Sequence, residues 1–146
     1  MFDFDSFEGR LPWHQSKWDP AALESQFGRS DVLPAWIADM DFKTVPAVQE
    51  AVLAFAAAGK PIAAICAAPS ILGHLGLLKG RRATAFPSFR DQLVGAILTE
   101  GDVVRDGPFL TAPGLGAAIP FALALVETLE GPAAAKDTAE RIGARQ

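Results

Sequence analysis

The chain contains a single cysteine, Cys66, and the residues around it favour a reactive thiol. Ala64 and Ala68 stand two residues before and two residues after it, where a short apolar run meets a predicted helix. Small flanking residues are typical of a nucleophile held on a sharp strand-to-helix turn, because larger side chains would clash there. The positive end of that helix would lower the pKa of the thiol toward the thiolate form. A buried, inert cysteine in an alanine-rich core is the alternative.

Other residues that could do chemistry form weaker patterns. His74 lies on an apolar helix, where a histidine more often packs than acts as a base. Asp39 and Asp41 could bind a cation, but two carboxylates in a turn are more often solvated turn residues. The run Gly114-Leu115-Gly116 lacks the third glycine of a dinucleotide-binding fingerprint. We therefore predict neither a metal site nor a cofactor.

Helical and strand patterns alternate along the chain from residue 46 onward. Apolar spacing and end residues predict helices at 20–27, 46–58, 69–78, 119–129 and 132–145, with a further helical turn or two at 89–96. Apolar runs predict short strands at 36–37, 61–65 and 83–87, and a hairpin over 103–111 that turns at Asp106-Gly107. This alternation predicts an α/β fold.

The composition fits one ordinary domain that needs neither a disulfide nor a metal ion to fold. The 146 residues are 50% apolar and 21% charged, with a formal net charge of −4. Because no basic patch is present, neither nucleic acid nor an anionic membrane is expected as a partner. The acidic start lacks the features of a secretory signal and predicts a cytoplasmic protein. Three prolines interrupt the uncharged stretch 107–126, so no membrane span is expected.

The numbers of charged residues and of tryptophans differ between the first 55 residues and the rest of the chain. Residues 1–55 carry 4 Lys plus Arg against 9 Asp plus Glu, together with all three tryptophans. Residues 56–146 carry 9 against 8 and no tryptophan. We therefore divide the chain into a mostly irregular N-terminal arm at 1–45 and an α/β domain at 46–146.

The domain resembles the second half of the DJ-1/ThiJ/PfpI superfamily over about residues 52–146. The resemblance rests on the run 59–69 around Cys66, on 83–87, on the hairpin turn with Leu110-Thr111, and on the glycine-led run 114–123. It implies a partial flavodoxin-like sandwich, similar to class I glutamine amidotransferases, that lacks the usual first half. Members are commonly dimers and are described as cofactor-independent glyoxalases, deglycases, redox sensors and chaperones. The resemblance implies that Cys66 is the nucleophile, that the backbone N–H of Ala67 is the oxyanion donor, and that the substrate is a small reactive carbonyl compound.

Two departures from the family pattern bear on catalysis. The family's acidic partner for the cysteine comes from the first half, which is not recognisable here, and Phe86 stands where some members have a histidine. Without a carboxyl group beside Cys66, the proton transfers of an enediol mechanism lack a shuttle. Catalysis and a non-catalytic role in assembly are therefore equally open interpretations.

Residues 1–54 resemble a different family, the MalY/PatB-type cystathionine β-lyases, which use pyridoxal phosphate. The run from Trp36 to Phe42 carries this resemblance, and in that family the region forms the entry arm, so that Ala38 and Asp39 would be marginal contacts at most. The lysine and the phosphate-binding loop that hold the cofactor lie farther along that family's chain, so pyridoxal phosphate is not expected. Because the two resemblances meet in the helix at 46–58, we interpret the reading frame as a chimera. A remnant of a carbon–sulfur lyase is the third functional alternative.

A half sandwich has an uncovered strand edge. In the parent fold the strand before Cys66 lies inside a parallel sheet, so the loss of the first half would leave Ile62 and Ile65 on an apolar edge. Residues 32–38 could pair with it, or the fold could be only marginally stable. We favour a loose fold or a homo-oligomer or partner chain that completes the sheet.

Overall fold

The computed structural model describes residues 19–32 and 44–144 of the chain. The chain divides into two compact units, Met1–Gln49 and Glu50–Gln146. The predicted strand at 36–37, the acidic pair Asp39 and Asp41, and Ala38 lie outside the described residues. No statement about the lyase-like run therefore follows from the structure.

The first unit contains helix α1 (Pro20–Phe27) and the start of helix α2 (Pro46–Ala57). Helix α1 begins where the Asp19 side chain accepts a hydrogen bond from the Ala21 N–H at 3.0 Å. It ends at Gly28, whose φ of +68° suits a residue without a Cβ. These end residues explain why the predicted bounds of α1 are confirmed.

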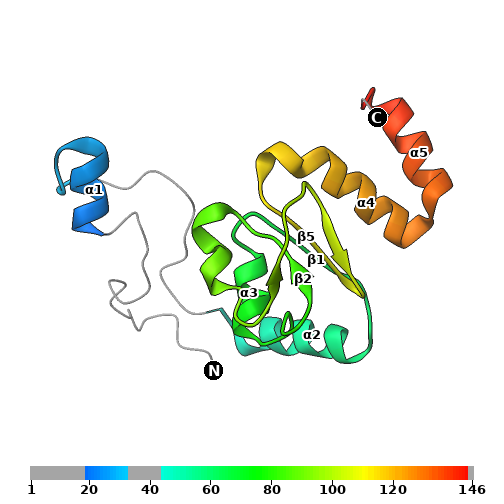
Figure 1. Cartoon of the computed structure of the whole chain (residues 1–146), viewed down its shortest axis with the longest axis horizontal. Coiled ribbons are helices and arrows are strands. Elements are labelled where there is room, and N and C mark those ends of the chain that lie inside the picture. The colour runs from blue at the N-terminus through cyan, green and yellow to red at the C-terminus, as the bar shows by residue number, and fades with distance from the viewer. Residues whose placement is uncertain (1–18, 33–43, 145–146) are drawn as a thin grey trace. The chain divides into compact units, whose positions relative to one another are not determined.

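The second unit is built on a three-stranded sheet with the strand order β1-β5-β4. Strand β1 (Ile62–Ile65) runs parallel to β5 (Phe109–Ala112), which pairs antiparallel with β4 (Val104–Asp106). Figure 1 shows the β4–β5 hairpin, which turns at Gly107 as predicted. This mixed arrangement of strands and helices confirms the predicted α/β class.

A second, two-stranded sheet pairs β2 (Arg82–Ala83) in parallel with β3 (Ile97–Leu98). The prediction of a strand over 83–87 was too long, and β3 was not predicted. The chain turns away from the strand direction because the Phe86 N–H donates to the Cys66 carbonyl, and Pro87 then starts the 3₁₀ helix η2 (Pro87–Gln92). Strands of two residues carry too little alternation to be recognised in a sequence.

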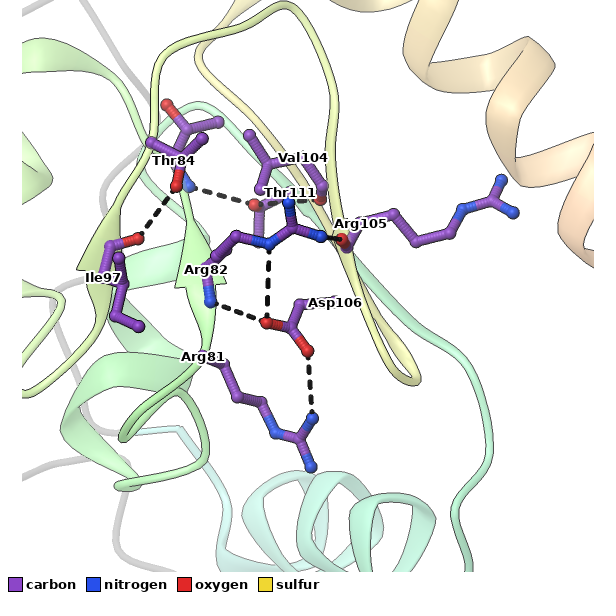
Figure 2. Close-up of polar contacts among 9 residues, drawn as sticks. Arg81, Arg82, Thr84, Ile97, Val104, Arg105, Asp106 and Thr111 are labelled. Carbon is purple, nitrogen blue, oxygen red and sulfur yellow. Dashed lines mark hydrogen bonds and ion pairs between the residues drawn. The ribbon is translucent and has the colours of Figure 1, made fainter.

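Side chains join the two sheets where backbone pairing is absent (Figure 2). The Asp106 carboxylate accepts the Arg82 N–H at 2.9 Å and faces the Arg81 guanidinium at 3.3 Å. The hydrogen bond from the Arg82 backbone and the two arginine charges lower the pKa of Asp106. Deeper in the unit, the fully buried Thr111 hydroxyl accepts the Thr84 N–H at 3.1 Å. These contacts attach the hairpin to the rest of the unit.

The helices of this unit follow the predictions except at their C-terminal ends. Helix α3 (Pro69–His74) stops before the predicted Leu78, since Gly73 weakens the helix and Gly76 adopts a φ of +72°. A short 3₁₀ helix, η3 (Leu115–Ala117), leads into α4 (Ala118–Glu130), and Gly131 separates α4 from α5 (Pro132–Arg141). Helix α5 ends four residues before the predicted Arg145. Figure 1 shows α4 and α5 as a helical pair.

The core of the second unit is small and combines alanines with three leucines and one phenylalanine. Seven buried residues form it: Ala64, Leu72, Leu78, Ala83, Ala85, Leu93 and Phe109. By contrast, no residue of α4 is buried, although its sequence is mostly apolar. Much apolar surface of this unit therefore remains at least partly open.

Candidate functional site

Cys66 lies in the turn between the end of β1 and the start of α3. Its φ of +65° makes it the only residue other than glycine with a positive φ among the described residues. A left-handed backbone costs a residue with a Cβ roughly 1–2 kcal/mol. Its side chain is exposed. An exposed thiol on a strained turn is the feature of this unit that most indicates function, since such strain persists only where the surrounding structure enforces it.

Backbone hydrogen bonds on both sides of Cys66 enforce this conformation. The Cys66 N–H donates to the Ala112 carbonyl at 3.0 Å, and the Cys66 carbonyl accepts the Phe86 N–H at 2.9 Å. The first bond extends the β1–β5 pairing by one residue, and the second links the turn to the segment after β2. The carboxyl ends of two neighbouring strands thus hold the cysteine, which is where ligands bind in open α/β sheets.

The two residues that follow the cysteine are Ala67 and Ala68, and the backbone groups of Ala67 differ in whether they have a hydrogen-bond partner. The Ala67 carbonyl accepts both the N–H and the hydroxyl of Ser70, at 3.0 and 2.7 Å, so its direction is fixed. The Ala67 N–H has no acceptor among the described residues. Ala68 packs against the core. The amide after the cysteine is therefore available to a ligand.

An open hollow of about 350 Å³ includes Phe86, which is hydrogen-bonded to the turn, in its lining. Its walls come from the segment after β2, from the loop before β4 and from the segment that follows β5: Phe86, Pro87, Asp102, Pro113, Gly114, Leu115, Gly116 and Ala117. Cys66 itself is not part of the lining; Phe86, whose N–H donates to the Cys66 carbonyl, is the lining residue that is hydrogen-bonded to the cysteine. The lining is mostly apolar, and Asp102 is its one carboxylate among the described residues. Asp102 was not predicted as a site residue, since its only signal in the sequence is its place just before the predicted hairpin.

Arg90 connects η2 to the segments that follow β2 and β3. Its guanidinium donates to the Glu100 carboxylate at 2.6 Å and to the Thr84 hydroxyl at 3.4 Å. The hydrogen bond between Arg90 and Glu100 lowers the pKa of Glu100. His74 contacts the Gln92 side chain at 3.2 Å on exposed surface. Neither contact connects its residue to Cys66. The described residues therefore place no acid or base in hydrogen-bond contact with the thiol.

The described ranges contain no cluster of three or more His, Cys, Asp or Glu side chains that could hold a metal ion. Within the same ranges, no helix combines the length and apolar character needed to cross a membrane. The predicted absence of a cofactor stays a prediction.

Comparison with known proteins identifies relatives of the second unit. A family model described as the DJ-1/PfpI family matches residues 37–128. The Drosophila melanogaster protein dj-1beta is 39% identical over 84 residues, which are 56% of this chain and 45% of that protein. The isonitrile hydratase of Pseudomonas putida is 41% identical over 78 residues, which are 52% of this chain and 34% of the enzyme.

Solved structures agree in fold. A mutant of a DJ-1 superfamily protein from Salmonella typhimurium superposes with a TM-score of 0.65 at 36% identity, covering 69% of this chain and 56% of that one. The chain thus spans roughly a third to a little over half of the relatives that it matches. The family match also begins inside the run from Trp36 to Phe42, on which the resemblance to the lyases rests.

Proposed function

The chain belongs to the DJ-1/PfpI family, and from this premise we propose that Cys66 is a nucleophile that attacks a small reactive carbonyl compound. One observation carries the proposal: an exposed thiol is held at a φ of +65° in a turn that is hydrogen-bonded to Phe86, which lines an open, mostly apolar hollow. The hollow is large enough for a compound of a few carbon atoms. A strained, exposed cysteine has no evident structural use in a small alanine-rich core.

The chemistry proceeds by addition to an aldehyde carbon. The Cys66 sulfur forms a bond to that carbon, and the carbonyl π electrons move to oxygen, giving a hemithioacetal alkoxide. The Ala67 N–H, which is free of described acceptors, is the donor that we assign to this oxygen. With an α-oxoaldehyde such as methylglyoxal, the proton on the sulfur-bearing carbon then moves to the neighbouring carbonyl carbon, which gives a lactoyl thioester of Cys66. Water adds to the thioester carbon, the C–S bond breaks, and lactate and the thiol are released.

The proton transfer requires a base, and we assign it to Asp102. It is the carboxylate that lines the hollow, and it replaces the acidic group that the family takes from its first half. Replacing Asp102 with asparagine keeps the size of the side chain but removes the base. We expect Asp102→Asn to slow lactate formation without changing the rate at which Cys66 is alkylated.

Alkylation by iodoacetamide tests the nucleophile. Because Cys66 is the single cysteine, the folded chain and the same chain in urea report on one thiol. We expect the folded chain to react faster at pH 7, since the turn exposes the sulfur beside an unpaired amide. An equal or slower rate in the folded state would show that the turn does not activate the thiol.

Two other activities of Cys66, attack on an isonitrile and oxidation as a redox sensor, can be tested on the same purified chain. Because one relative is an isonitrile hydratase, an alkyl isonitrile is the alternative electrophile, in which the sulfur would again attack carbon. A redox-sensor role would appear as selective oxidation of Cys66 by dilute peroxide with no turnover of either compound.

The predicted lyase-like arm and the chimeric frame stay proposals. They rest on the run from Trp36 to Phe42 and on the difference in composition between residues 1–55 and 56–146. Sequencing reads from the source genome that cross residues 45–60 test the chimera, and their absence would reject it as a natural frame. A new absorbance band on adding pyridoxal phosphate would support the lyase remnant.

A further inference from the structure

Arg90 lies on η2 and bridges the segments that follow β2 and β3. Its guanidinium donates to the Glu100 carboxylate at 2.6 Å, to the Thr99 carbonyl at 3.3 Å and to the Thr84 hydroxyl at 3.4 Å. The side chain of Arg90 is 25% exposed and that of Glu100 is 87% exposed. The arginine thus extends from a buried threonine to a carboxylate on the surface of the unit.

The contacts of Arg90 lie next to residues that line the hollow. Thr84 precedes Phe86 by two positions, and Glu100 precedes Asp102 by two positions. Phe86 and Asp102 both belong to the lining, and they come from different segments. Since two residues of chain span at most about 7 Å, each contact restrains the wall that follows it. Arg90 therefore couples the positions of these two walls.

One end of this bridge is anchored in the core. Thr84 and Thr111 are 1% and 0% exposed, and the Thr84 N–H donates to the Thr111 hydroxyl at 3.1 Å (Figure 2). The Thr111 hydroxyl in turn donates to the Val104 carbonyl at 3.4 Å, so Thr84 is attached to both strands of the hairpin. The wall that contains Phe86 therefore has support that does not depend on the arginine.

Asp102 lies on the segment 99–103 between β3 and β4, which has fewer attachments. The Thr99 N–H donates to the Ala83 carbonyl at 3.0 Å. Residues 101–103 form no hydrogen bond with another residue in the part of the chain that the structure describes. The contacts of the guanidinium are therefore the attachments closest to Asp102.

We propose that Arg90 is a positioning residue, which holds Asp102 in place relative to the wall that contains Phe86. This role rests on the proposed function, in which Asp102 is the base. A guanidinium suits it because its donors form a rigid planar fork, so that one side chain meets a carboxylate, a carbonyl and a hydroxyl at once. A base that is displaced by about 1 Å can lose a factor of about 100 in rate.

Arg90→Met tests the positioning. Methionine is also a long side chain, and it lacks the Nε–H, which is buried without a partner among the described residues, so we expect the urea midpoint to change little. The backbone order parameters of Gly101 and Asp102 should fall from about 0.85, which is typical of a rigid backbone, to below about 0.6 in nitrogen-15 relaxation. Lactate formation should slow at least about tenfold through kcat. The alkylation rate of Cys66 should not change, because Asp102 acts only after the sulfur has added.

Arg105→Met is the matched control. Arg105 also donates to a backbone carbonyl, that of Ala124 at 3.0 Å, and to a carboxylate, that of Glu127 at 3.2 Å. Both acceptors lie on α4, and neither lines the hollow. This variant should leave the order parameters of Asp102 and the rate of lactate formation as in the wild type. Equal effects of the two substitutions would overturn the proposal, since the loss of any arginine contact would then loosen the segment.

Glu100 provides a second pair of variants if Arg90→Met does not fold. Its side chain is 87% exposed, so Glu100→Ala should fold and should lower the same order parameters. Glu100→Gln keeps an acceptor for the guanidinium and should retain most of the order.

Three results would overturn the proposal. They are a wild-type segment 99–103 that is already flexible, unchanged order in both Arg90→Met and Glu100→Ala, and a wild-type rate of lactate formation in a variant whose segment has become flexible. The order parameters need no turnover, so they decide the role of Arg90 even if the wild type forms no lactate. That last result would instead reject the proposed function.

Discussion

Replacing Cys66 with glycine should stabilise the protein relative to replacing it with alanine. The φ of +65° costs a residue with a Cβ roughly 1–2 kcal/mol, and alanine retains this cost. Glycine avoids it but loses about 0.5–1 kcal/mol through the greater entropy of its unfolded chain. The difference favours Cys66→Gly over Cys66→Ala by about 0.5–1 kcal/mol, which is a shift of roughly 1–4 °C in the melting temperature for a chain of this size.

Urea denaturation of the two variants measures this difference as a change in midpoint at an unchanged slope. Ala68, two residues later, provides the matched control because its φ of −58° is ordinary. There the same alanine-to-glycine change should destabilise by about 0.5–1 kcal/mol, so the sign of the effect reverses between the two positions. If Cys66→Gly is no more stable than Cys66→Ala, the turn is not strained and its φ of +65° gives no indication of function.

Three further substitutions test how the unit is held together. Thr111→Val should cost roughly 1–3 kcal/mol in urea denaturation, because it leaves the buried Thr84 N–H without its acceptor; a loss below about 0.5 kcal/mol would mean that water or a shift replaces the hydroxyl. Gly73→Ala should destabilise by about 1–3 kcal/mol, because its Cβ would meet the backbone of Gln92 and Leu93 at the end of η2, whereas Gly116→Ala meets nothing within 4 Å and should change the midpoint little. The Asp106 carboxylate stabilises the folded chain above the pKa of an unfolded carboxyl, and this stability is lost as the pH falls through the lowered pKa of the folded group. Asp106→Asn should remove this contribution, so the melting temperature of the mutant should depend less on acid pH. Equal acid sensitivity of mutant and wild type in pH-dependent melts would refute it.

Local sequence signals predicted the parts of the fold that depend on local physics. Pro20 and Gly28 mark the ends of α1, and Asp106-Gly107 marks the hairpin, since helix ends and tight turns depend on a few residues. The ends of α3 and β2 were predicted wrongly for a different reason. They depend on contacts between distant segments, such as the hydrogen bond from the Phe86 N–H to the Cys66 carbonyl. Such contacts leave no local pattern.

The candidate site shows the same division. The alanines around Cys66 and the apolar run before it predicted a cysteine between a strand and a helix. The hollow could not be predicted, because Phe86, Asp102 and the run 113–117 meet there only after the hairpin folds back. The hydrogen bond from the Thr84 N–H to the Thr111 hydroxyl could not be predicted either, since a single threonine in a hydrophobic strand does not indicate which donor its hydroxyl will meet.

The most direct test of the central claim is the formation of lactate from methylglyoxal by the wild-type chain and by Cys66→Ser. Serine keeps the shape of the side chain but is a far weaker nucleophile at neutral pH. We predict that the wild type produces more lactate than there are protein chains and that Cys66→Ser produces none above the uncatalysed rate. Equal rates in the two proteins, or no turnover by the wild type, would contradict the assignment of Cys66 as the nucleophile.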